Sequence, residues 1–204
     1  MIKTPNPSEV VQELFSHHKE ILKNINQESV DVYLWLKNEY KKGNIKDNTV
    51  FQFVFRSYYR LDNAGLGEKL KRKYFELLNR KENKLETILH GLYIISTDNG
   101  NNTVQFSFAT KLLHTIDNSK PIFDKEVSAV IHKAVIGNNG KEKRESAKRI
   151  YVYLENLYSI LAENKKINII IKQFRKKFNA DVKTITNQKV LDFLIWSLGK
   201  LKNK

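Results

Sequence analysis

The chain contains no cysteine at any of its 204 positions. This absence excludes disulfides, thiolate metal sites, iron–sulfur clusters and a cysteine nucleophile. The chain also lacks an apolar run of the roughly 20 residues that a transmembrane helix needs. Its opening, MIKTPNPSEV, has no apolar stretch of the kind found in signal peptides. We therefore expect a cytoplasmic protein that has no membrane partner.

The composition is that of a chain that folds. Hydrophobic residues make up 41% of the sequence and aromatic residues 11%, which argues against global disorder. The length suits one domain with a substantial core, and the sequence shows neither an internal repeat nor a long linker. We expect a single domain over residues 1–204, in which residues 1–7 are flexible.

Positive charge exceeds negative charge by 14. Residues 1–110 carry 16 basic and 13 acidic side chains, whereas residues 111–204 carry 20 and 9. A concentration of positive charge is the electrostatic feature expected of a protein that contacts phosphates. The excess of lysine also fits compositional drift or an ordinary solvated basic surface. We therefore expect the protein to bind nucleic acid, specifically double-stranded DNA, through the basic segment 137–204.

Apolar residues recur at helical spacing along nearly the whole chain. Only residues 51–55 alternate as a strand would, and the length and flanks of that segment favour a helix. The sequence thus predicts an all-α domain of about nine or ten helices. The predicted helices cover about residues 7–25, 29–43, 48–59, 68–79, 84–96, 104–116, 125–136, 141–163, 167–178 and 187 onward.

One segment combines helical patterning with reactive side chains. Lys111 lies on the apolar stretch FSFATKLLHTI, and Asp124 follows the Pro-Ile-Phe that leads into the next helix. Partial burial would lower the pKa of the lysine, and a neutral amine is a nucleophile able to form a Schiff base. An aspartate at a helix start is an ordinary N-cap and also a well-placed carboxylate.

This layout of helix, Gly-containing turn, helix with lysine and then aspartate resembles the helix-hairpin-helix superfamily of DNA glycosylases, in particular its 8-oxoguanine glycosylase branch. The resemblance covers about residues 85–136. It implies that a hairpin over 98–102 contacts the DNA backbone, with Asn99, Gly100 and Asn101 at its tip. It further implies that Lys111 attacks C1′ of a damaged nucleotide and that Asp124 assists.

Further basic residues are candidates for contacts with phosphate. The opening of the helix predicted at 141–163 carries five of them, with Glu142 and Glu145 interleaved: Lys141, Lys143, Arg144, Lys148 and Arg149. Arg56 and Arg60 could support such contacts, although a structural salt bridge to Asp62 or another carboxylate is the stronger interpretation.

The candidate catalytic residues have ordinary structural alternatives. Lys111 could extend its ammonium into water from a helix edge, and Asp124 could be a plain N-cap. His114 could tune the pKa of Lys111 or contact DNA, but a hydrogen-bonded core histidine is more common. The adjacent His17 and His18 point to different helix faces and cannot chelate one ion, so we expect no metal and no cofactor.

Two functions of different class remain open. The first is a base-excision DNA glycosylase with lyase activity, which uses Lys111 and Asp124 on a damaged or modified base. The second is a helical protein without catalysis that binds nucleic acid or another partner, such as a component of a phage or mobile-element defence system. The sequence leaves the oligomeric state open.

Overall fold

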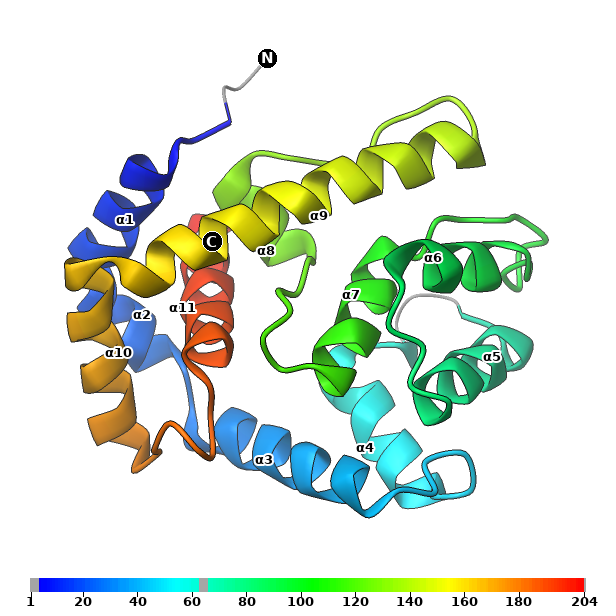
Figure 1. Ribbon diagram of the computed structural model, residues 1–204, viewed down its shortest axis with the longest axis horizontal. Helices are drawn as coiled ribbons and strands as arrows, with labels where there is room; N and C mark the ends of the chain where they lie inside the picture. The colour runs from blue at the N-terminus through cyan, green and yellow to red at the C-terminus, as the bar shows by residue number, and fades with distance from the viewer. Residues whose placement is uncertain (1–3, 63–65, 204) are drawn as a thin grey trace. The chain divides into compact units, whose positions relative to one another are not determined.

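The computed structural model describes residues 4–62 and 66–203, which form eleven α-helices and no strand (Figure 1). The predicted all-α class is therefore confirmed for this part of the chain, in which no helix combines the length and apolarity required to cross a membrane. The helices are α1 (Pro7–Ser16), α2 (His18–Asn24), α3 (Gln27–Lys42), α4 (Thr49–Tyr59), α5 (Glu68–Asn79), α6 (Leu85–Tyr93), α7 (Phe106–Ile116), α8 (Lys125–Ile131), α9 (Gly140–Glu163), α10 (Lys165–Phe178) and α11 (Asn187–Lys202).

The largest departures from the helix boundaries expected from the sequence are at two places. The predicted helix 7–25 is interrupted at His17, which separates α1 from α2 with φ −102° and ψ 11°. The predicted helix 125–136 ends at Ile131, because His132 adopts a left-handed conformation with φ 52°. Apolar spacing continues past both points and gives no sign of the change in backbone direction.

Side-chain caps fix several helix starts. At α1 the Asn6 side chain accepts from the backbone of Glu9, and the Glu9 carboxylate accepts from the backbone of Asn6. Such reciprocal capping satisfies two of the N–H groups that a helix end leaves without partners. Residues 1–3 of the segment expected to be flexible lie outside the described part. Single caps stand before α4, α8, α10 and α11: Asn48, Asp124, Asn164 and Thr186.

The chain divides into two compact units, each described here by itself. Unit 1 comprises residues 1–30, 118–134 and 149–204, and unit 2 comprises residues 31–117 and 135–148. The expectation of a single domain stays a prediction. The division matters for function because Lys111 belongs to unit 2 and Asp124 to unit 1.

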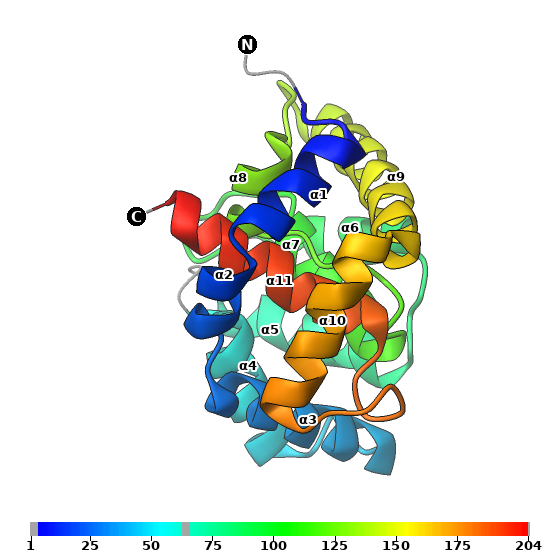
Figure 2. The same ribbon diagram turned by 90° about the vertical axis from the view of Figure 1, so that its left-hand side faces the viewer.

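Helix α11 is central to unit 1. It packs most extensively on α8 and also contacts α2, α10 and α1. Figure 2 shows α1, α2 and α10 beside α11. Ten of its residues are buried, so it is covered on nearly all sides. At the contact with α8, a Cβ on Gly199 would lie 2.2 Å from the carbonyl oxygen of Glu126. The two helices thus approach closely where α11 has no side chain.

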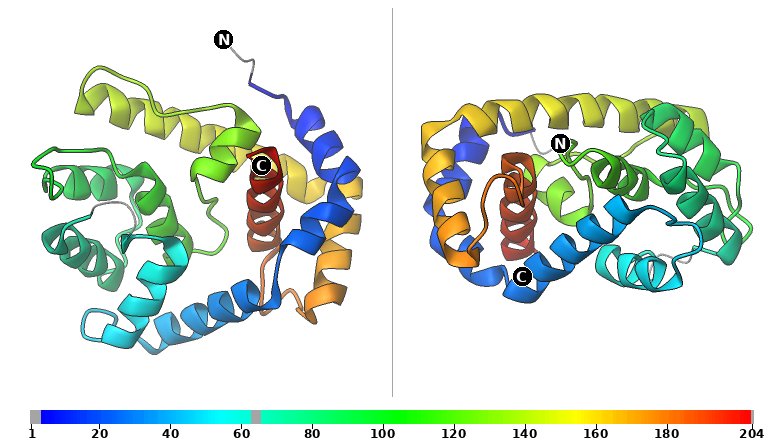
Figure 3. Two further views of the ribbon diagram at one scale, coloured as in Figure 1. Left: turned by 180° about the vertical axis from the view of Figure 1, so that it is seen from behind. Right: turned by 60° about the horizontal axis from the view of Figure 1, so that its bottom comes forward.

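Unit 2 has an aromatic core formed by α4, α5 and α7, with α6 packed on α5 and α7. Figure 3 shows these helices from two further directions. The ring of Phe55 lies 5.7 Å from those of both Tyr74 and Phe75, measured between centroids. The Tyr74 hydroxyl donates to the carbonyl of Phe108 at 3.2 Å, which satisfies a phenol that burial would otherwise leave unpaired.

Candidate functional site

Lys111 is buried in unit 2, with only 8% of its surface exposed. Its Nζ donates to the backbone carbonyl of Tyr59 at 3.1 Å, and it lies 5.0 Å from the centroid of the Phe108 ring. The alternative of an ammonium extended into water is therefore wrong. Tyr59 is the last residue of α4, so its carbonyl is one of those that have no partner inside the helix. The lysine thus caps the negative end of the α4 dipole.

Asp124 is the N-cap of α8 in unit 1. Its Oδ1 accepts from the backbone N–H groups of Glu126 and Val127, each at 3.0 Å. The N-cap interpretation is confirmed, and it leaves a carboxylate that is partly exposed. A shared cleft for the amine of Lys111 and this carboxylate stays a prediction, since the two side chains belong to different units.

The predicted hairpin lies in the connection between α6 and α7. The N–H of Gly100 donates to Thr97 O, and the N–H of Thr97 donates to Asn101 O, both at 2.9 Å. Gly100 has φ 75°, a left-handed conformation that favours glycine. The tip residue Asn99 is exposed, as are both of its neighbours on the C-terminal side. The turn is therefore present, and its contact with a DNA backbone remains untested.

The basic opening of α9 is partly closed by its own acidic residues. The N–H of Glu142 donates to Asn139 Oδ1 at 3.0 Å, and the Glu142 carboxylate accepts from the N–H of Asn138 at 2.8 Å. A carboxylate thus already lies where an anion would meet the positive end of the helix dipole. The helix start itself is therefore a poor site for an external phosphate.

The five basic residues predicted there have different environments. Lys148 forms ion pairs with Glu145 at 2.6 Å and with Glu86 at 3.5 Å. The guanidinium carbon of Arg144 lies 4.7 Å from the centroid of the Tyr93 ring, which makes it part of the packing between α9 and α6. The other three are exposed and form no ion pair within the described residues: Lys141, Lys143 and Arg149.

The three predicted supporting residues have mainly structural surroundings. Arg56 Nε lies 3.2 Å from Asp62 Oδ2, which confirms the predicted salt bridge. Arg60 is exposed and ends α4 in a left-handed conformation with φ 58°. His114 is only 1% exposed, and its ring centroid lies 6.0 Å from that of Tyr33. The arrangement of His114 is that of a core histidine.

Sequence reasoning missed the strongest basic element, helix α10. Its sequence, KKINIIIKQFRKKF, carries six lysines and arginines and no acidic residue in 14 positions. One face is buried through Ile167, Ile170, Ile171, Phe174 and Phe178. An acid-free run of this kind is visible in the sequence. Counting charge over the halves of the chain placed the excess in residues 111–204 but did not locate it in this helix.

Two cations near the end of α10 serve its packing. Lys177 Nζ donates to the carbonyl of Ile25 at 2.9 Å and also to that of Leu22, near the end of α2. Arg175 Nη2 donates to Ile185 O at 2.9 Å and to Asn187 Oδ1 at 2.8 Å. Burial lowers the pKa of both basic groups.

Three other lysines of α10 face outward. Lys165, Lys172 and Lys176 are exposed and form no ion pair with any described residue. Spacings of seven and four residues place them on one side of the helix, over a length of about 16 Å. We call these three residues the α10 lysine face.

A buried ion pair lies in α11 of unit 1. Lys189 Nζ and Asp192 Oδ2 are 2.7 Å apart, with side-chain exposures of 2% and 9%. The hydroxyl of Tyr158 is buried nearby, and burial, followed by the charges of Asp192 and Asp124, raises the pKa of this phenol well above 10.0. Because the two opposite charges compensate each other in the interior, we interpret the cluster as structural.

Comparison of the chain with protein-family models, with curated proteins and with solved structures found no match. The resemblance to helix-hairpin-helix glycosylases thus rests on the sequence segment 85–136 alone.

Proposed function

We propose that the protein binds nucleic acid through the α10 lysine face of unit 1. The observation that carries this proposal is the acid-free sequence of α10, whose outward side presents Lys165, Lys172 and Lys176 without carboxylate partners among the described residues. Neutralising phosphates releases counterions from the nucleic acid, and unpaired surface lysines do this without first breaking an ion pair. The opening of α9, where Glu142 occupies the helix start and Glu145 pairs with Lys148, is a weaker candidate.

The proposal is tested by fluorescence anisotropy with a labelled DNA duplex over a series of salt concentrations. Replacing the three lysines of the face by glutamine should weaken binding and lower the slope of log K against log salt by up to about 0.9 for each lost phosphate contact. A matched control replaces three exposed lysines of unit 2, Lys41, Lys69 and Lys81, which changes the net charge equally. Equal weakening in both variants would assign the binding to overall charge and exclude the face.

A DNA glycosylase with lyase activity is a second candidate, favoured by the burial of Lys111 against aromatic rings. In that reaction the neutral amine forms a bond to C1′, and the glycosidic bond breaks so that the base leaves with the electron pair. The amine then loses a proton and the C1′–O4′ bond of the sugar opens, which gives an imine that borohydride can reduce to a stable adduct. The adduct should form with duplex that contains 8-oxoguanine or an abasic site, and it should be absent in Lys111→Gln and present in Lys141→Gln.

The role of Asp124 can be separated from its capping. Asn caps a helix about as well as Asp but has no charge, so Asp124→Asn should keep the melting temperature. If the carboxylate stabilises the developing positive charge of the sugar, adduct formation by this variant should slow about ten-fold or more. Unchanged adduct formation would leave Asp124 as a cap alone.

A further inference from the structure

Helix α4 in unit 2 carries an aromatic side chain that the fold does not use. The sequence has 22 aromatic residues, all of them in the described part of the chain, and Phe53 alone is classed as exposed, with 62% of its surface accessible. Val50, one turn earlier, is exposed to 61%. Single exposed apolar residues are common, but an aromatic and an aliphatic side chain in adjacent turns form a patch.

The exposure of Phe53 follows from the phase of α4. The helix buries Phe51, Phe55 and Tyr59, which recur at intervals of four residues. Residue 53 lies two positions from both Phe51 and Phe55 and therefore points to the opposite side. The alternation that resembles a strand in the sequence thus becomes a helix with aromatic rings on two faces, only one of which contacts the core.

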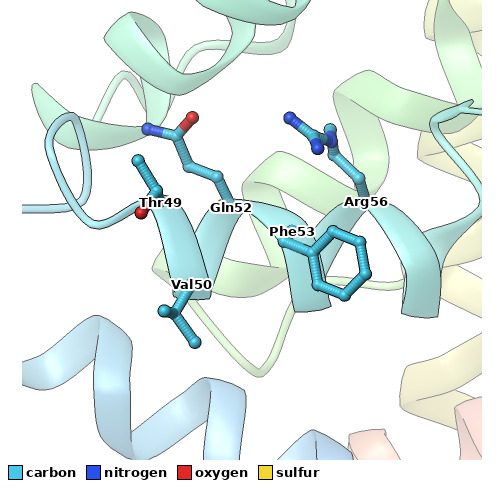
Figure 4. A pocket seen from close by; sticks show the side chains of 5 residues that line it. All are labelled: Thr49, Val50, Gln52, Phe53 and Arg56. Carbon is cyan, nitrogen blue, oxygen red and sulfur yellow. The ribbon is translucent and has the colours of Figure 1, made fainter.

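Phe53 borders a surface pocket of about 500 Å³. The other lining residues are Thr49, Val50, Gln52 and Arg56, and Figure 4 shows the Gln52 and Arg56 side chains directed to the same side of α4. The volume lies within the range of about 300–1,000 Å³ typical of sites for small molecules. An open pocket with one aromatic wall and a few polar groups can accept a planar heterocycle.

The charges around the pocket favour an anion. Arg56 directs its Nε to Asp62, and Lys71 Nζ lies 2.8 Å from the same carboxylate. Lys71 also pairs with Glu68 at 3.1 Å, so two cations meet two acids. Within the described residues the Nη atoms of Arg56 form no ion pair. Lys46 and Arg60 are exposed at the two ends of the helix. The patch therefore combines an apolar ring with the guanidinium of Arg56.

Gln52 supplies a fixed polar group at the pocket. Its Nε2 donates to the carbonyls of Ile45 at 3.0 Å and Lys46 at 2.6 Å. Both amide hydrogens are thereby engaged, and the orientation of the side chain is set. Its Oε1 remains an acceptor, suited to an exocyclic amine of a base.

We propose that this pocket stacks an unpaired base of single-stranded nucleic acid on Phe53, with Arg56 at the adjoining phosphate. The inference rests on the proposed nucleic-acid binding and refines it by naming a strand with unpaired bases. Every base has a π-face, so stacking on the Phe53 ring should be possible whatever the base sequence. The Arg56 guanidinium would bind the phosphate backbone. A base-paired duplex buries its faces in its own stack and would not use this site.

The experiment measures the affinity of the full chain for a labelled oligothymidine and for the same strand with abasic positions. Phe53→Ala should weaken oligothymidine binding at least about five-fold and leave abasic binding nearly unchanged. Phe53→Leu keeps an apolar side chain without a π-face and should behave like Phe53→Ala, whereas Phe53→Trp should restore affinity. In Phe53→Trp, titration with oligothymidine should also quench the indole fluorescence, whereas titration with the abasic strand should not. Because residue 53 is exposed, none of these variants should alter the fold, which circular dichroism checks.

The other outcomes are distinct. Normal oligothymidine binding by Phe53→Ala would overturn the inference while nucleic-acid binding stands. Absence of any nucleic-acid binding by the unmodified chain would overturn both. Self-association that Phe53→Ala abolishes and Phe53→Leu retains, seen by analytical ultracentrifugation, would assign the patch to a second copy of the chain and overturn the inference as well.

Discussion

The two units each bury a lysine in a different way. In unit 2 the ammonium of Lys111 contacts the Tyr59 carbonyl and the faces of aromatic rings. In unit 1 the ammonium of Lys189 lies 2.7 Å from a carboxylate that is itself buried. The first lysine satisfies one end of a helix, and the second forms an ion pair along one face of its own helix. Each buried lysine therefore has a structural explanation, so its burial alone is not evidence of a catalytic role.

The comparison bears on how much each lysine contributes to stability. Removing one partner of a buried ion pair leaves an uncompensated charge, which costs more than the loss of one charged hydrogen bond to a carbonyl. A backbone carbonyl that loses its hydrogen-bond donor is an unpaired neutral group, which is less costly to bury than an unpaired charge. The unit 1 pair should therefore be the more sensitive of the two.

The largest effect is expected at Asp192. Asp192→Ala should lower the free energy of unfolding by about 3–5 kcal/mol, because Lys189 would retain a buried charge without its carboxylate. Urea denaturation measures the change. The double variant Lys189→Met with Asp192→Leu should recover most of the loss, since two apolar side chains of similar size need no compensation. A double variant as unstable as the single one would show that the pair is not the source.

A smaller effect is expected at Lys111. Lys111→Met keeps the length of the side chain but leaves the Tyr59 carbonyl without this donor, and it should cost about 1–3 kcal/mol. Lys200→Met is a suitable control, since that lysine lies over the Trp196 ring at 4.3 Å and is only partly buried. The control should cost less than about 0.5 kcal/mol. If both variants lost the same free energy of unfolding, the hydrogen bond from Lys111 to the Tyr59 carbonyl would not explain the loss.

The smallest effect is expected at the exposed carboxylate of Asp62. The hydrogen bond from Lys71, together with the charge of Arg56, lowers the pKa of Asp62 below 3.8. A depressed pKa stabilises the fold at pH values above that of the unfolded chain, and the benefit disappears as the pH falls through the folded value. Asp62→Asn should therefore cost at most about 0.5–1 kcal/mol at pH 7, since solvent screens the pair.

The pH dependence of the stability lost in Asp62→Asn tests whether the charge of Asp62 is its cause. Thermal melts of Asp62→Asn and of the unmodified chain should converge as the pH is lowered below about 3.8. A gap that stays constant down to pH 2 would contradict the assignment, because a protonated Asp62 has no charge to offer Lys71 or Arg56. The exposed pair would then contribute through packing alone.

The sequence predicted the helices better than it predicted their surroundings. Apolar spacing located ten of the helical segments, and the residue type at Asp124 predicted its cap. The same spacing could not place His132 in a left-handed conformation, since histidine adopts either backbone region. Nor could the pattern of α4 show that Phe53 lies outside, because either side of a helix with phenylalanine at 51, 53 and 55 could face the core.

The sequence by itself determined the helical class, the absence of thiol chemistry and the acid-free charge of α10, since these follow from residue types and their local order. Only the tertiary structure decided that Lys111 caps α4, that His114 is buried beside Tyr33 and that Lys189 meets Asp192 in the interior. The reason is physical: burial and the choice of partner depend on which helices pack together, and one chain offers each charged side chain many possible partners.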